Sequence, residues 1–190
     1  MTGYDIIEDA RARLADNEDL SYVEADMLRF LNDAIRDFAQ TGCIQGVTNI
    51  DSSAGTLTVF SDDRHIEVFR VDGPEGLLSF AALSDLSVRQ TTELRVPLSW
   101  TLWGGVIYLD GQTPGTFTVW YSYTPLDMTG LQENINTQLN KYRHALTAYV
   151  EWRSRKQNDD PLANQAEAEY IQTKATAATI AKARFSGGTQ

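Results

Sequence analysis

Cysteine and long apolar runs are both scarce in this sequence. Cys43 is the only cysteine among 190 residues, so the chain can form neither an internal disulfide nor a cysteine-based metal site. No apolar run approaches the length of a membrane-spanning helix. The acidic N-terminal region also lacks the order of a signal peptide, in which a positively charged segment precedes an apolar one. We therefore expect a protein that is assembled in a reducing compartment and does not enter a membrane.

Known catalytic motifs are also missing. The sequence has no phosphate-binding glycine loop, no His-Glu-x-x-His pair and no Gly-x-Ser-x-Gly elbow. His144 lies at the edge of an apolar helical stripe and fits a surface or hydrogen-bonded histidine better than a general base. The other histidine, His65, could share one face of a strand with Asp63 and Glu67, with Asp62 nearby. These side chains could bind a metal, but a solvated strand face beside a turn is the better interpretation. We expect no catalytic residue, no metal and no cofactor, and hence no enzyme.

Positive charge is limited, since 16 Lys and Arg residues stand against 26 Asp and Glu residues, for a net charge of −10. Only residues 128–190 carry a net positive charge, of +2. An acidic body repels phosphate, so tight nucleic-acid binding would require a large basic patch. The one candidate patch is Arg153, Arg155 and Lys156, near the end of a predicted helix, where cations also complement the helix dipole. The helix-end interpretation is the better one, and we expect no tight grip on DNA.

Hydrophobic periodicity predicts helices at both ends of the chain. Apolar residues recur at three- and four-residue steps over residues 3–15, 22–40, 137–157 and 161–183. Thr2 is a predicted N-cap of the first helix, and Ser21 with Glu24 has the spacing of a capping box for the second. Gly42 is expected to stop the second helix, and Asp160 with Pro161 to start the fourth. The predicted core of these helices consists of Leu31, Ile35, Phe38, Leu139, Leu146 and Tyr149.

The central region changes to a period of two. Five strand-like runs lie between residues 47 and 123, and they favour an antiparallel meander of about five strands. Gly104 and Gly105 fit a two-residue hairpin turn, and DGQTPG fits a second, looser turn. The segment FAALSDLSVRQ is either a short helix or an irregular excursion. In FTVWYSY, one face carries Phe117, Val119, Tyr121 and Tyr123.

Together these elements predict an α+β fold, a four-helix bundle with an antiparallel β subdomain inserted between the second and third helices. The expected boundaries are residues 1–45 and 128–185 for the bundle and 46–127 for the β subdomain. Residues 186–190 are expected to form a flexible C-terminal tail.

The order of elements, with three local patterns, resembles the head-to-tail adaptor proteins of tailed bacteriophages. The first pattern is a helix with Leu28, Leu31, Asn32 and Ala34, in LRFLNDAIRDFAQ. The second is a strand exit with Tyr123 and Pro125, and the third a helix with Tyr142, Ala145, Leu146 and Tyr149. The family includes connector and head-completion proteins and, in short-tailed phages, tail tubular proteins. The resemblance covers residues 22–42 and 117–175, and the region between them only in its β character.

The resemblance implies a structural protein of the virion that is assembled in the host cytoplasm. Such adaptors form a ring, typically twelve-fold, beneath the portal protein, and their β module reaches toward the next tail or nozzle protein. DNA would pass through an acidic channel without specific binding. The C-terminal tail usually inserts into the portal, and here the portal-binding residues would be Arg184, Phe185, Ser186, Gly187, Gly188, Thr189 and Gln190. Plain terminal disorder is the competing interpretation of this segment.

Two other functions fit parts of the sequence. The chain could be a different neck protein, such as a stopper or a tail terminator. It could also be a carbohydrate-binding or depolymerising module, with Trp100, Trp103, Trp120 and Tyr121 as a sugar platform. Aromatic residues that alternate along strands are more often core or interface residues, which weakens that second alternative.

Overall fold

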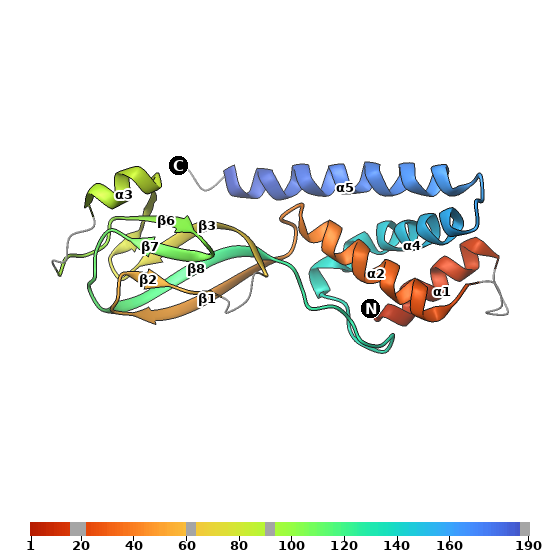
Figure 1. Cartoon of the computed structure of the whole chain (residues 1–190), viewed down its shortest axis with the longest axis horizontal. Coiled ribbons are helices and arrows are strands. Elements are labelled where there is room, and N and C mark those ends of the chain that lie inside the picture. Colours follow the sequence, from red (N-terminus) through yellow and green to blue (C-terminus); the bar gives the residue numbers. More distant parts are fainter. Residues whose placement is uncertain (16–21, 60–63, 90–93, 187–190) are drawn as a thin grey trace. The chain divides into compact units, whose positions relative to one another are not determined.

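The computed structural model describes residues 1–15, 22–59, 64–89 and 94–186. Within these residues the fold is mixed α/β, with five α-helices, one 3-10 helix and eight strands. The chain divides into two compact units, which are drawn in Figure 1. The helical unit consists of residues 1–44 and 124–190, and the β unit consists of residues 45–123.

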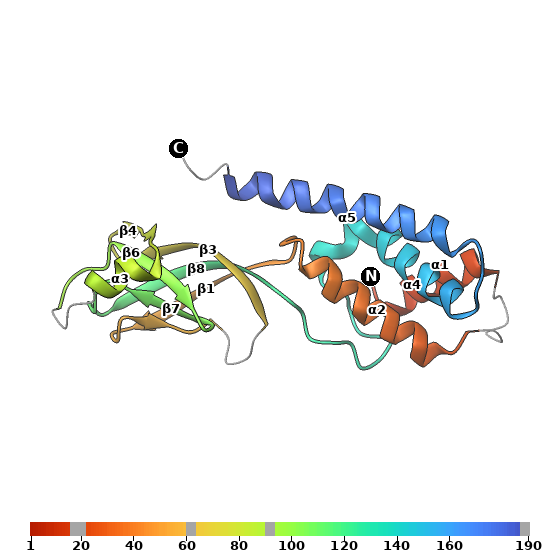
Figure 2. The same cartoon turned by 45° about the horizontal axis from the view of Figure 1, so that its top comes forward.

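Four long helices and one short one build the helical unit. They are α1 (Gly3–Leu14), α2 (Glu24–Ala39), η1 (Thr137–Tyr142), α4 (Arg143–Gln157) and α5 (Ala163–Ser186). Helix α4 packs against α1, α2 and α5, as the two views in Figures 1 and 2 show. All six predicted core residues are buried, so the predicted apolar faces are confirmed. Helix α4 is therefore the central helix in the apolar core of this unit.

Capping explains where α1 begins and corrects the start of α2. Thr2 forms a capping box with Asp5, with Thr2 N donating to Asp5 Oδ2 at 2.7 Å and Asp5 N donating to Thr2 Oγ1 at 3.3 Å. The predicted N-cap of α1 is thus confirmed. The predicted capping box of α2 is wrong, because Glu24 is the first helical residue and Val23 is the N-cap, without a side-chain hydrogen bond. Ser21 lies outside the described residues.

Asn32 fastens α2 to the segment that follows the β unit. Its Nδ2 donates to the carbonyl oxygen of Met128 at 3.0 Å, and Met128 N donates to Asn32 Oδ1 at 2.9 Å. Both bonds are buried, so the side-chain amide replaces two hydrogen bonds that the Met128 backbone would otherwise make with water. This contact gives a physical role to the asparagine of the first adaptor-like pattern.

The third predicted helix differs at its start. Residues Thr137–Tyr142 form a 3-10 helix, and α4 begins only at Arg143. The Asn136 side chain accepts a hydrogen bond from Gln138 N at 2.9 Å and so begins the tighter turn. Leu139 and Tyr142, three residues apart, are both buried, as a helix with three residues per turn requires. A 3-10 turn that starts with this side-chain bond therefore replaces the first predicted α-helical turns.

The β unit holds two four-stranded sheets. Its strands are β1 (Gln45–Ser52), β2 (Thr56–Leu57), β3 (His65–Gly73), β4 (Gly76–Leu77), β5 (Ser79–Phe80), β6 (Ser99–Trp103), β7 (Val106–Leu109) and β8 (Gly115–Tyr123). The strand orders are β1-β8-β3-β4 and β2-β7-β6-β5. The predicted simple meander is wrong, because β8 lies between β1 and β3, and β5 pairs with β6 in parallel. The DGQTPG segment leads from β7 in one sheet to β8 in the other, so it is no hairpin turn.

One apolar core lies between these two sheets. Phe117 and Val119 of β8 are buried with Ile107 of β7 and Leu57 of β2, in agreement with the predicted alternation along β8. Gly104 and Gly105, at φ 56° and 80°, join β6 to β7 in the predicted two-residue turn. The ambiguous segment contains a short helix, α3 (Leu83–Arg89).

Asp110 anchors the approach to β6 and should make the β unit acid-sensitive. Its buried carboxylate accepts from the N–H groups of Leu98 at 2.8 Å and Ser99 at 3.0 Å, and from Arg95 Nη2 at 2.6 Å. Burial raises the pKa of Asp110, but the hydrogen bonds from Ser99, Leu98 and Arg95 outweigh it, so the pKa lies below its usual value. The carboxylate therefore stabilises the fold above an unfolded-state pKa of about 3.9. That contribution is lost as the pH falls through the lower folded-state pKa.

We expect Asp110→Asn to lower the free energy of unfolding at pH 7 and to differ less from the unsubstituted protein at pH 3. Urea unfolding measures both values when it is followed by tryptophan fluorescence, to which the β unit contributes three of the four tryptophans. Asp85→Asn, at an exposed position in the same unit, is the matched control. If Asp110→Asn lowers the free energy of unfolding by the same amount at both pH values, the charge of the carboxylate does not contribute to the stability of the β unit.

Candidate functional site

The predicted portal-binding segment begins inside a helix. Helix α5 continues to Ser186, so Arg184, Phe185 and Ser186 are its last three residues. The predicted end of this helix, at residue 183, is therefore too early, because the alanine-rich sequence continues to favour helix up to the two glycines. Residues 187–190 lie outside the described part of the chain.

The long helix α5 packs along one stripe of small residues. Ala163, Ala166, Ala177 and Ala181 are buried with Tyr170 at steps of three, four and seven residues. Alanine side chains allow neighbouring segments to approach the helix closely. On the rest of its surface, Ile171 is 55% exposed and Ile180 is 42% exposed. They are nine positions apart, so they lie on opposite sides of the helix, and each is an apolar side chain exposed to solvent.

A groove of about 640 Å³ lies along α5, beside α4 and the end of α2. Its floor is aromatic, with Tyr149 and Tyr170 at a centroid distance of 4.8 Å and Trp152 stacked on Tyr170 at 6.4 Å. Asp37 accepts hydrogen bonds from Tyr170 Oη and, at 2.6 Å, from Lys174 Nζ. Burial, with the neighbouring Asp37 carboxylate, raises the pKa of Tyr170, so this phenol stays protonated. The three groups hold α2 and α5 together.

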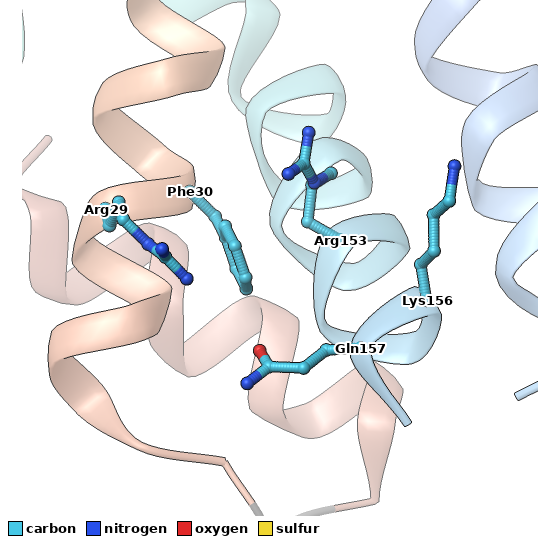
Figure 3. A pocket seen from close by; sticks show the side chains of 5 residues that line it. All are labelled: Arg29, Phe30, Arg153, Lys156 and Gln157. Carbon is cyan, nitrogen blue, oxygen red and sulfur yellow. The ribbon is translucent and has the colours of Figure 1, made fainter. Parts of the chain in front are cut away.

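A second, smaller pocket combines positive charge with aromatic rings. The Arg153 pocket, as we name it, has a volume of about 440 Å³ and is lined by Arg29, Phe30, Arg153, Lys156 and Gln157. Figure 3 shows these side chains, with the Phe30 ring between the side chains of Arg29 and Arg153. The guanidinium carbons of Arg29 and Arg153 lie 5.0 and 5.4 Å from the centroid of the Phe30 ring. The rings hold the cations by cation–π attraction and limit their freedom.

The predicted basic group at the end of α4 is divided by the structure. Arg155 is buried, and its guanidinium donates to Glu151 at 2.9 Å, to Asp160 at 2.5 Å and to the carbonyl oxygen of Arg13 at 2.8 Å. Arg155 thus ties α1 to the α4–α5 turn and is not available to a partner. Arg153 and Lys156 instead line the Arg153 pocket. Sequence reasoning missed Arg29 and Phe30, since only the packing of α2 beside α4 brings them to this pocket.

The other candidate residues do not form a site together. Trp100 is 3% exposed and Trp103, on the same strand, is 62% exposed, whereas Trp120 carries the Arg70 guanidinium at 4.6 Å from its ring. The structure therefore contradicts a joint sugar platform. His144 is exposed beside the Thr173 hydroxyl at 3.4 Å, as expected of a surface histidine. Cys43 is buried.

Metal and membrane sites are not found in the described residues. There, no group of three His, Cys, Asp or Glu side chains could hold a metal ion. Asp62 and Asp63, from the acidic group around His65, lie outside that part of the chain. Nor does any helix in the described ranges combine the length and the apolar character that crossing a membrane requires.

Comparison with known protein families shows to which family this chain belongs. The model of the SU10 adaptor protein family matches residues 1–189, nearly the whole chain. The chain belongs to the SU10 adaptor protein family. Membership makes it a structural protein of the bacteriophage neck, and it confirms the resemblance to head-to-tail adaptors at that level. The match is to the SU10 adaptor family and not to the tail tubular type. None of the curated proteins matches this sequence.

The SU10 adaptor family also favours a non-enzymatic role and a place in the virion. It implies association with the portal and tail proteins of a phage. The groove along α5 and the Arg153 pocket are therefore best considered as surfaces for protein contacts.

Proposed function

We propose that this chain forms a ring, of twelve copies, that joins the portal protein to the downstream tail or nozzle protein. The observation that carries this proposal is the match to the SU10 adaptor family over residues 1–189. A symmetric neck requires identical copies around one axis, and a head-to-tail contact between copies closes into a ring when its rotation fits.

Each unit has a separate role in this proposal. The helical unit is the domain that faces the portal, and its C-terminal segment from Arg184 to Gln190 inserts there. The β unit, with its own core between two sheets, reaches the next tail component. Exposed apolar side chains on the β unit support such a contact, because Phe80 and Leu77 are 66% and 62% exposed.

The charge of the chain supports a passive channel. A ring of copies with a net charge of −10 repels the phosphates of passing DNA, so the genome moves through without specific binding. The ring catalyses nothing in this proposal, since its task is to hold two protein assemblies together around the channel.

Electron microscopy of the purified chain mixed with its portal tests the proposal. We expect a ring of adaptor density on the tail-facing side of the portal, with twelve subunits. Binding to isolated tails but not to portals would instead indicate a stopper or a tail terminator. If the chain forms no ring and does not bind the portal, the adaptor role proposed here is refuted.

A further inference from the structure

We propose that the Arg153 pocket receives carboxylate side chains from a neighbouring copy of this chain. The contact is head-to-tail, with the pocket of one copy against an acidic surface of the next. This inference rests on the proposed ring, and it names the chemistry that holds adjacent copies together.

The cations of the pocket are prepared for an anionic partner. Arg153 lies within 6 Å of three ring centroids, those of Phe30, Trp152 and Tyr149, at 5.4, 5.7 and 5.9 Å. Lys156 Nζ lies 5.6 Å from the Trp152 ring. Neither Arg153 nor Lys156 forms an ion pair within the described part of the chain, unlike Arg155 beside them. Two cations that are held by rings and lack a counter-charge make a site that favours carboxylates.

The rest of the chain supplies the complementary charge. Residues 1–40 alone carry a net charge of −6. Exposed carboxylates such as Glu8 and Glu75 have no ion-pair partner among the described residues. Copies with a net charge of −10 repel one another, so a stable contact between them needs a local surface of opposite sign. The Arg153 pocket provides such a surface.

Duplex DNA fits the Arg153 pocket less well than a carboxylate side chain does. The pocket offers three cations, and Arg29 among them is already paired with Asp26 at 3.0 Å. Affinity for a DNA duplex depends on the number of phosphates that the protein neutralises. The net negative charge of the rest of the chain repels those phosphates and so lowers that affinity. A short carboxylate side chain fits a pocket of about 440 Å³ without bringing a long anionic backbone against that body.

The test counts adaptor copies that co-sediment with tailless, DNA-filled heads. Arg153→Glu/Lys156→Glu is expected to reduce the bound copies below detection, and Lys156→Glu alone to weaken binding about tenfold. Lys141→Glu is the matched control, because Lys141 is also exposed and lies 4.8 Å from a ring, that of Tyr142, outside the pocket. It should bind within about twofold of the unsubstituted chain. Circular dichroism checks that each variant is folded, and Arg153→Met/Lys156→Met replaces the double reversal if it is not.

Mixing separates a copy–copy contact from a portal contact. The double variant keeps its own acidic surface, so it should occupy the pocket of an unsubstituted copy and stop ring growth on the heads. A mixture that binds no less than the unsubstituted chain alone would overturn the inference and assign the pocket to another protein. Duplex DNA retained by the unsubstituted chain and lost by the double variant would assign it to DNA. Full rings formed by the double variant would overturn this inference alone, whereas an unsubstituted chain that forms no ring on heads overturns the proposed function with it.

Discussion

Deletion of residues 184–190 is expected to leave the helical unit folded and to abolish docking to the portal. The physical basis is that this segment ends a long helix and holds one arginine and one phenylalanine among small and polar residues. Among the α5 residues whose side chains are described, the last buried one is Ala181, before the deletion begins. A segment of seven residues can make only a small contact, which gives weak affinity per copy. A ring engages many such segments at once, so avidity makes the docking stable. Deletion of the segment from every copy removes all of these contacts, so no docking should remain.

Co-sedimentation with tailless heads measures this effect. Deletion of residues 187–190 alone is the informative comparison, because it keeps the end of α5 with Arg184 and Phe185. We expect this shorter deletion to retain part of the binding and Arg184→Ala/Phe185→Ala to lose most of it. If the chain without residues 184–190 sediments with heads as well as the full chain does, the portal contact lies on the helices instead.

Leu146→Ala should destabilise the helical unit by about 2–5 kcal/mol. Leu146 is fully buried on α4, the helix that packs against α1, α2 and α5. The substitution removes apolar contacts and leaves a cavity that a well-packed core fills only in part. Urea unfolding followed by the helical circular dichroism signal measures the change.

Leu162→Ala is the control for this substitution, since Leu162 lies in the same unit and is 53% exposed. It should change the free energy of unfolding by less than about 0.5 kcal/mol. Equal midpoints for the two variants would mean that Leu146 does not belong to the core.

The helices and their buried faces could be predicted because local information determines them. The period of the apolar residues around Leu31 and Leu146 gives the face, and the Thr2–Asp5 pair gives the start of α1. The start of α2 could not be found in the same way, because Val23 caps it without a side-chain bond. The 3-10 turn after Asn136 depends on a competing side-chain hydrogen bond, which a helical period does not reveal.

The sheet topology and the Arg153 pocket share one reason for being missed. Strand alternation predicts that β8 is half-buried, but it cannot say that β8 lies between β1 and β3. Likewise, Arg153 and Phe30 are 123 positions apart and meet only because α2 packs beside α4. Both features depend on contacts between distant segments. The C-terminal segment was proposed as a site from family resemblance, and its partner lies outside this chain.

The pairing of β1 with β8 makes the β unit an exchangeable cassette. Gln45 pairs with Ser122, so the two points where the chain enters and leaves this unit lie side by side, about 5 Å apart. A gap of that size can be closed by a linker of a few residues. A phage lineage can therefore replace the whole cassette by recombination within residues 45–123 without moving the ends of the helical unit. Under the proposed function, such an exchange would alter the contact with the tail and leave the contact of the helical unit with the portal unchanged.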